Sequence, residues 1–238
     1  HVHGVIAAIA PHDSVERFEG LGVTVIRAAA RFTGPAEAEA GGQRIRARRF
    51  VVATGSAAAI PPVPGLAEVP YLTNETIFGL TGRPDHLLVL GGGPIGVEMA
   101  QAFRRLGAAV SLVERGAILP KDEPEAVAVL RARLLREGVA LREGAEVLAA
   151  RRAANGVELE LRGADTPVVL RGSHLLVAAG RRPNIEGLGL DAAGIATTPR
   201  GITVDARLRS TNRRVFAIGD VAGGPQFTHI AGYHAGIV

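Results

Sequence analysis

The sequence contains no cysteine, no tryptophan and only one methionine. Without cysteine, these 238 residues can form no disulfide, no thiolate metal site and no dithiol redox pair, and no metal site of another kind is predicted. Long apolar runs are also missing, because none approaches the roughly 20 residues that a membrane-spanning helix needs. The opening residues, His1–Val5, lack the basic region and apolar core of a signal peptide. We therefore expect no membrane association and a cytoplasmic location.

Aromatic residues are scarce, at 4%, and lysine occurs once, as Lys121. The net charge of +4 therefore comes from arginines, which are scattered along the chain. Surfaces that bind nucleic acid combine clustered basic residues with stacking aromatic side chains, so no nucleic-acid partner is expected. Hydrophobic residues make up 47% of the chain, which is enough to build a packed core in one large or two small domains.

One stretch near the middle of the chain combines a strand, a glycine-rich turn and a helix. The apolar run His86–Leu90 predicts a buried parallel strand, and the G-x-G-x-x-G pattern follows it directly. The first glycine permits a tight turn, the second lets a pyrophosphate approach the backbone, and the third allows close helix–strand packing. The helix N-terminus supplies N–H groups to the anion. The predicted NAD-binding residues of this turn are Gly91, Gly93, Pro94, Ile95 and Gly96.

A carboxylate follows these glycines at the spacing of a ribose-binding acid. Residues 109–113 predict a second apolar strand, which ends at Glu114. A carboxylate at this place accepts hydrogen bonds from the ribose hydroxyls of NAD and repels the 2′-phosphate of NADP. Arg115 is the next residue and can instead pair with a 2′-phosphate, so NADP stays possible. The alternative is a glycine-rich turn of an ordinary α/β protein, with Glu114 solvated.

Shorter elements are expected before this motif. Residues 14–22 predict a short helix that ends at glycine, and residues 23–26 and 31–32 predict strands. A glycine pair at residues 41–42 separates two β-like runs, which indicates a hairpin. Residues 50–52 predict a buried strand.

Two elements are expected after the motif. Asp122 is placed to cap a helix that runs to Gly138, with apolar residues along one face. Residues 146–170 contain short β-like runs separated by turn signals at Asn155-Gly156 and Arg162-Gly163. Such spacing predicts a small antiparallel meander.

Three further apolar runs end in glycine, where open α/β sheets place their ligands. They are residues 50–52, 174–177 and 215–218, followed by Thr54-Gly55, Gly180 and Gly219-Asp220. Asp220 is well placed to accept hydrogen bonds from sugar or ribityl hydroxyls. The alternative is an aspartate that caps the next helix.

Together these segments resemble the pyridine-nucleotide–disulfide oxidoreductases, the flavoenzymes that include dihydrolipoamide dehydrogenase, glutathione reductase and mercuric reductase. The matching motifs are Ala53-Thr54-Gly55-Ser56, Gly91–Ala100, Ala179–Asn184 and Val215–Asp220. Their order and spacing match as well, and residues 99–107 look closest to the mercuric-reductase-like branch. The resemblance implies an α/β protein in which a Rossmann-like NAD-binding domain is inserted into a partial FAD-binding domain.

The resemblance also implies the roles of individual residues. The glycines of the central motif would hold the NAD pyrophosphate, Glu114 the adenine ribose, and Gly180 would border the nicotinamide. Glu98 matches a family glutamate near nicotinamide and flavin and is the one candidate catalytic residue. The residues implied for FAD are Thr54, Gly55, Arg181, Gly219, Asp220, Phe227 and Thr228.

The motifs divide the chain into three segments. Residues 1–66 and 184–238 are assigned to the FAD-binding domain and residues 67–183 to the NAD-binding domain, with the prolines at 61, 62 and 64 near the first boundary. The family's first dinucleotide fingerprint and its redox cysteine pair are not found, so we expect this stretch to be the middle of a longer, homodimeric enzyme. We expect residues 1–238 alone to bind NAD(H) weakly and FAD poorly.

Three functions are compatible with this pattern. The first is an NAD(P)H-dependent flavoprotein oxidoreductase that passes a hydride from nicotinamide to flavin and on to a disulfide or similar acceptor. The second is an NADH oxidase or quinone-type reductase on the same plan, which needs no dithiol. The third is a non-catalytic module that binds NAD.

Overall fold

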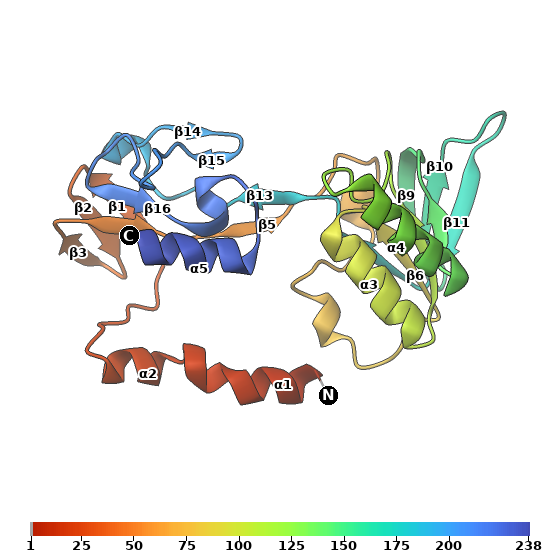
Figure 1. The fold of residues 1–238 in the computed structure, drawn as a ribbon, viewed down its shortest axis with the longest axis horizontal. Helices are drawn as coiled ribbons and strands as arrows, with labels where there is room; N and C mark the ends of the chain where they lie inside the picture. The colour runs from red at the N-terminus through yellow and green to blue at the C-terminus, as the bar shows by residue number, and fades with distance from the viewer. Residues whose placement is uncertain (1) are drawn as a thin grey trace. The chain divides into compact units, whose positions relative to one another are not determined.

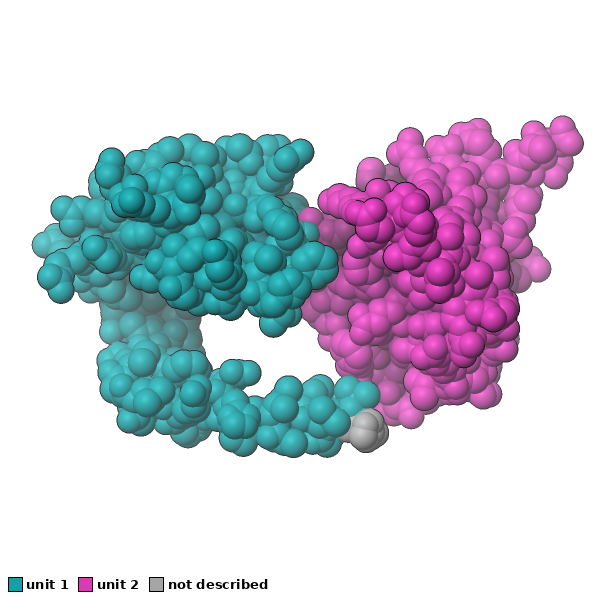
Figure 2. All heavy atoms as spheres, viewed as in Figure 1, with its two compact units in different colours: residues 1–57, 182–238 teal, residues 58–181 magenta. Residues whose placement is uncertain are grey.

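The computed structural model describes residues 2–238, which form two compact units (Figures 1 and 2). Unit 1 consists of the chain up to Ala57 and from Arg182 onward, and unit 2 consists of Ala58–Arg181. The proline-rich segment at residues 61–64 therefore belongs to unit 2. Two contacts attach this segment to unit 2. Pro64 O accepts a hydrogen bond from Ala150 N at 2.8 Å, and the neighbouring Leu66, only 1% exposed, packs in a core of that unit.

A four-stranded parallel sheet forms the centre of unit 2. Its order is β12 (His174–Val177), β6 (His86–Leu90), β7 (Ala109–Val113) and β8 (Ala140–Arg142), and each neighbouring pair is parallel. The predicted strand 86–90 is thus central, between two partners. This position explains its unbroken apolar sequence, because both faces of a central parallel strand are covered.

Helices cover one face of this sheet and an antiparallel meander covers the other (Figure 1). The helices are α3 (Pro94–Arg105) and α4 (Pro124–Arg136). The meander consists of β9 (Val147–Ala153), β10 (Gly156–Leu161) and β11 (Val168–Gly172), paired in the order β11-β10-β9. The meander and its predicted turns are confirmed.

Alternate residues of β6 belong to two different cores. Leu87 and Val89 pack in the cluster that includes residues of α3 and α4, while Leu88 and Leu90 pack with residues of the meander. All except Leu90, at 8%, have no exposed surface. Side chains of a strand point alternately to its two faces, so both layers are built on one strand.

Unit 1 contains three separate small sheets, one of which is the two-stranded antiparallel pair formed by residues 197–198 and 201–202. The strands β1 (Ala30–Gly34), β2 (Glu37–Ala40) and β3 (Gln43–Arg46) form an antiparallel sheet that includes the predicted hairpin. Parallel pairing joins β4 (Phe50–Val52) to β16 (Val215–Ala217). Val52, Val215 and Ala217 are buried in the core of this unit, whereas Val51 is 48% exposed.

The remaining elements are short. Two 3-10 turns belong to unit 2, two short strands include residues of both units, and all the others belong to unit 1. They are α1 (Val2–Ile9), η1 (Ala10–Asp13), α2 (Val15–Gly20), β5 (Ser56–Ala58), η2 (Leu66–Glu68), η3 (Ile77–Gly79), β13 (Arg181–Pro183), η4 (Asp191–Ala193), β14 (Thr197–Thr198), β15 (Gly201–Ile202), η5 (Gly219–Ala222) and α5 (Thr228–Ile237). No helix among residues 2–238 has the length and apolar character needed to cross a lipid bilayer.

Three local predictions were wrong. Residues 23–26 form no strand, because the Val23 N–H is used to close the end of α2 on Phe18 O, at 3.0 Å. Asp122 does not cap α4; the N-cap is Glu123, which makes no side-chain capping bond, and Pro124 has no N–H to satisfy at the first helical position. The strand 50–52 is buried only in part, since Val51 faces solvent.

Acid is expected to weaken unit 2 through Glu137, the C-cap residue of α4. Its carboxylate accepts hydrogen bonds from Arg105 at 2.8 Å, Arg133 at 2.5 Å and Gln101 at 3.2 Å. These bonds, that of Arg105 above all, lower the pKa of the Glu137 carboxyl from 4.5 to about 2. Because the folded pKa lies below the unfolded one, the stabilisation is present above pH 4.5 and is lost as the pH falls toward 2.

Urea unfolding of the parent and of Glu137→Gln at several pH values tests this contribution. Between about pH 5 and about pH 3, we expect the variant to lose less of its unfolding free energy than the parent does, because it has no carboxylate to protonate. Glu75→Gln, at an exposed position of the same unit, serves as the control and should follow the parent. Equal acid sensitivity in the parent and Glu137→Gln would contradict the assignment.

Candidate functional site

The turn from β6 into α3 has room for glycine alone at two positions. Gly91 has a φ of +114°, and a Cβ there would lie 2.4 Å from Ala178 O. A Cβ on Gly96 would lie 2.0 Å from Gly91 O. Backbone atoms cannot move aside as a flexible side chain can, so these glycines let β6, β12 and α3 meet closely. The structure thus supplies the physical reason for two of the three predicted glycines.

Gly93 has a different surrounding. It is the N-cap of α3, with an ordinary φ of −73°, and no atom lies within 4 Å of a Cβ built on it. Its backbone therefore borders open space at the start of the helix. Pro94 is exposed and Ile95 half-buried in the first turn of α3. First-turn N–H groups have no acceptor within a helix, so they can bind an anion placed here.

The carboxylate of Glu114 is held against this turn by two backbone amides. It accepts hydrogen bonds from Gly92 N at 2.6 Å and from Gly116 N at 2.8 Å. Glu114 is half-buried, at the end of β7. Each carboxylate oxygen can accept more than one hydrogen bond, so acceptor capacity remains for a sugar hydroxyl. The predicted acid and the predicted glycines are therefore neighbours in the structure.

Gly92 is a site residue that the sequence reasoning missed. A Cβ on Gly92 would lie 2.9 Å from Cγ of Glu114 and 2.9 Å from a methyl group of Ile118. A side chain there would push Glu114 away from the turn. The signal was present as a run of three glycines, but the G-x-G-x-x-G pattern leaves the residue at the second position open.

Three other predicted residues of unit 2 lie at the surface. Arg115 is exposed; with the larger effect of Arg162, its charge lowers the pKa of the Glu146 carboxyl. Glu98 is an exposed residue of α3. Gly180 is exposed, with a φ of +140°, and its carbonyl accepts a hydrogen bond from Ala59 N at 3.0 Å.

In unit 1, hydrogen bonds join the segment after β4, at residues 54–55, to Asn184. Thr54 Oγ1 donates to Asn184 O at 2.8 Å, and Asn184 Nδ2 donates to Thr54 O at 2.9 Å. Asn184 N also donates to Gly55 O, at 3.0 Å. Gly55 has a φ of +65°, and nothing lies within 4 Å of a Cβ built on it. Arg181, the last residue of unit 2, begins β13 and is half-buried.

The turn after β16 brings Asp220 to the same region of unit 1. Ser56 Oγ donates to Asp220 Oδ2 at 2.5 Å, which ties the turn to the segment after β4. Gly219 has a φ of +67°. Asp220 lies in η5, seven residues before the N-cap of α5, so it does not cap that helix.

The start of helix α5 carries the last two residues implied for FAD. Thr228 is its first residue and Phe227 is its N-cap; both are exposed. Within the helix, His234 Nδ1 accepts a hydrogen bond from Gly219 N at 3.1 Å. His234 is half-buried, and this bond holds the Gly219 turn.

No group of three or more metal-ligating side chains occurs within residues 2–238. The arrangement in both units is instead one of glycine turns, backbone amides and single carboxylates. Such sites bind phosphate groups and sugar hydroxyls.

Comparison with known proteins supports the same interpretation. The family model described as pyridine nucleotide-disulphide oxidoreductase matches residues 10–235. A mercuric reductase of Streptomyces lividans is 40% identical over 201 residues, which covers 84% of this chain and 42% of the relative. A dihydrolipoyl dehydrogenase of Thermus scotoductus is 38% identical over 226 residues, covering 90% of this chain and 47% of the relative.

Solved structures agree with the sequence relatives. The HOCl-induced flavoprotein disulfide reductase RclA from Escherichia coli matches with a TM-score of 0.83 at 30% identity, covering 92% of this chain and 51% of that one. LpdA from Mycobacterium tuberculosis matches with a TM-score of 0.85 at 28% identity, covering 98% and 53%. The chain therefore spans less than half the length of these curated relatives and about half of these solved chains. With its fold, its motifs and its relatives in agreement, the chain belongs to the pyridine nucleotide-disulphide oxidoreductase family.

Proposed function

We propose that the chain provides the two dinucleotide sites of an NAD(P)H-dependent flavoprotein oxidoreductase. Unit 2 would bind the nicotinamide dinucleotide and unit 1 would bind part of FAD. The observation that carries the proposal is the turn at residues 91–96, where two glycines are required by close backbone contacts and a third borders open space.

The residues of unit 2 fit a dinucleotide. Gly93 leaves room for a pyrophosphate beside the first turn of α3, whose N–H groups and partial positive charge would stabilise it. Pro94 and Ile95 would border the pyrophosphate, and Glu114, fixed by two amides, would accept hydrogen bonds from the adenine ribose. A carboxylate at this position favours NAD over NADP, and Arg115 is the residue that would bind a 2′-phosphate.

The residues of unit 1 fit the hydroxyl-bearing part of a flavin nucleotide. Asp220 offers carboxylate oxygens, and Gly55 leaves its surroundings open. Thr54 and Asn184 keep the neighbouring segments together, and His234 holds the Gly219 turn. When bound, a flavin supplies a two-electron acceptor for the hydride of reduced nicotinamide. We assign Phe227 and Thr228 to the same site. Arg181, of unit 2, is also assigned to FAD, and Glu98 and Gly180 are assigned to the nicotinamide.

The terminal acceptor is proposed to be a disulfide or a chemically similar group. Because residues 1–238 contain no cysteine, a dithiol that passes electrons to such an acceptor has to come from another segment or another molecule. We also propose that the full-length protein that contains these residues is a homodimer.

Calorimetric titration of the chain with NADH tests the nucleotide site. We expect one NADH to bind per chain and FAD to bind more weakly than NADH, since only part of the flavin site is carried by residues 1–238. A titration without heat, together with an unfolding temperature that NADH leaves unchanged, would contradict the proposal.

Hydride transfer is tested with the full-length protein. Anaerobic addition of NADH is expected to bleach the absorbance of its bound flavin, and Glu98→Gln should slow that step. A non-catalytic NAD module would bind NADH and leave the flavin oxidised. Bleaching that proceeds at the parent rate in Glu98→Gln would remove Glu98 from the catalytic residues.

A further inference from the structure

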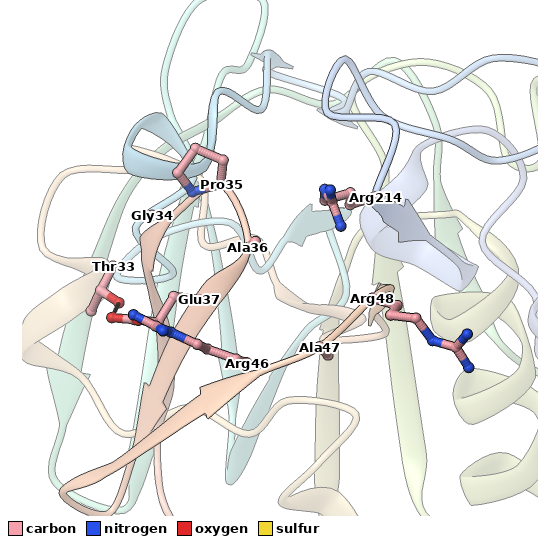
Figure 3. A pocket seen from close by; sticks show the side chains of 9 residues that line it. All are labelled: Thr33, Gly34, Pro35, Ala36, Glu37, Arg46, Ala47, Arg48 and Arg214. Atoms are coloured by element: carbon pink, nitrogen blue, oxygen red, sulfur yellow. Dashed lines mark hydrogen bonds and ion pairs between the residues drawn. The ribbon is translucent and has the colours of Figure 1, made fainter.

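A pocket of about 610 Å³ in unit 1 lies away from all the residues assigned above. Its walls come from the β1–β2 turn, the segment between β3 and β4, and the residue before β16 (Figure 3). The charged residues that line it are three arginines and one glutamate, namely Arg46, Arg48, Arg214 and Glu37. Thr33, Gly34, Pro35, Ala36 and Ala47 complete the lining.

Strand pairing brings the two chain segments that carry Arg48 and Arg214 side by side. In the parallel pair of β4 and β16, Val215 is in register with Phe50, and Phe50 N donates to Arg214 O at 2.9 Å. Arg214 therefore lies just before β16, and Arg48 lies just before β4. The proposed flavin residues follow the carboxyl ends of these parallel strands, so the pocket is at the opposite end of the pair.

One side chain ties the walls of the pocket together. Asn212 Nδ2 donates to Pro35 O at 2.9 Å and to Ala193 O at 2.8 Å. Arg214 N donates to Asn212 Oδ1 at 3.0 Å. The β1–β2 turn and the residue before β16 are thus held in place by the fold, and the pocket does not have to be assembled by a ligand.

The charges in the pocket are not balanced. The Glu37 carboxylate is used by Arg46 at 2.8 Å, Thr33 at 3.1 Å and Arg44 at 3.4 Å. Among residues 2–238, no acidic side chain pairs with Arg48 or Arg214. Figure 3 shows Arg46 turned toward Glu37 and Thr33, while Arg48 and Arg214 lie apart from that pair.

We propose that this pocket binds a condensed phosphate chain, either free or as part of a nucleotide. Guanidinium groups present planar sets of donors that match phosphate oxygens, and Arg48 and Arg214 have those donors available. The volume lies within the range of small-ligand sites, about 300–1,000 Å³, which a single phosphate would leave mostly empty. Arg48 and Arg214 come from two different segments of the pocket wall, so an anion that pairs with both needs more than one charged group.

Calorimetric titration with sodium tripolyphosphate and with ATP tests the proposal, using the parent chain and the double variant Arg48→Gln/Arg214→Gln. The double variant should bind at least about tenfold more weakly, because each lost guanidinium removes charge-assisted hydrogen bonds. Arg207→Gln, at an exposed position of the same unit, is the matched control and should bind as the parent does. Tighter binding of ATP would identify a nucleotide as the source of the phosphate chain, and tighter binding of tripolyphosphate would identify the free anion.

The double variant leaves the turn at residues 91–96 intact, so phosphate that binds to the proposed nucleotide site would still be measured in it. Equal affinity of parent and double variant would therefore overturn the proposal, as would the absence of binding to the parent. Thermal unfolding checks that the double variant is folded, and both substituted side chains are exposed. Raising the salt from about 50 mM to about 200 mM should weaken binding to the parent more than to the double variant.

Discussion

Replacement of Gly96 by alanine is expected to destabilise unit 2 by about 3 kcal/mol and to abolish NADH binding. The added Cβ would lie 2.0 Å from Gly91 O, a backbone atom. The backbone of Gly91 cannot move aside. Its N–H donates a hydrogen bond to Val113 O at 2.9 Å, and Ala178 O packs against it, 2.4 Å from where a Cβ on Gly91 would lie. The helix α3 therefore has to move away from β6. Urea unfolding and NADH titration measure the two effects.

Gly93→Ala is the matched control for this prediction. Its Cβ would meet no atom within 4 Å, and its φ of −73° suits any residue. We expect the unfolding free energy to stay within about 1 kcal/mol of the parent, because the loss at the N-cap and the gain in backbone entropy nearly cancel. NADH binding should still fall at least about tenfold, since a methyl group would occupy the space proposed for the pyrophosphate. If Gly93→Ala bound NADH like the parent, the phosphate site would not be at this turn.

Substitution of Glu114 by glutamine is expected to weaken NADH binding by about 10- to 100-fold and to affect NADPH much less. A hydrogen bond between a ribose hydroxyl and a carboxylate contributes about 1.5–3 kcal/mol, and the neutral amide loses most of it. Glutamine also has one oxygen where Glu114 uses two, on Gly92 N and Gly116 N, so one of these amides loses its acceptor. Titrations with NADH and NADPH measure the change in preference.

The adjacent Arg115→Gln is the control for nucleotide preference. Arg115 is exposed, and we expect NADH binding by this variant to stay within about twofold of the parent. The opposite pattern would reverse the assignment: a parent that binds NADPH at least as tightly as NADH, and an Arg115→Gln variant that loses NADPH. In that case Arg115, and not Glu114, would select the nucleotide.

The sequence predicted those elements in which an apolar repeat and a residue that begins or ends the element lie close together in the chain. The strand at 86–90, the helix after the glycine-rich turn and the turns of the meander were confirmed because apolar patterning and glycine act within a few residues. The prediction for residues 23–26 was wrong, although the sequence is rich in β-branched residues. A strand needs a partner, and the Val23 N–H is bonded to the preceding helix instead.

Residues 1–238 alone determined the family resemblance, the order of the motifs and the glycines of the nucleotide turn. The tertiary structure decided that Gly92 meets Glu114 and that His234 meets Gly219, and it placed Arg48 and Arg214 in the lining of one pocket. The members of these pairs lie 15 to more than 160 positions apart in the sequence. Strand pairing and turn geometry bring them together, and a pattern that spans a few neighbouring residues contains no information on such pairing.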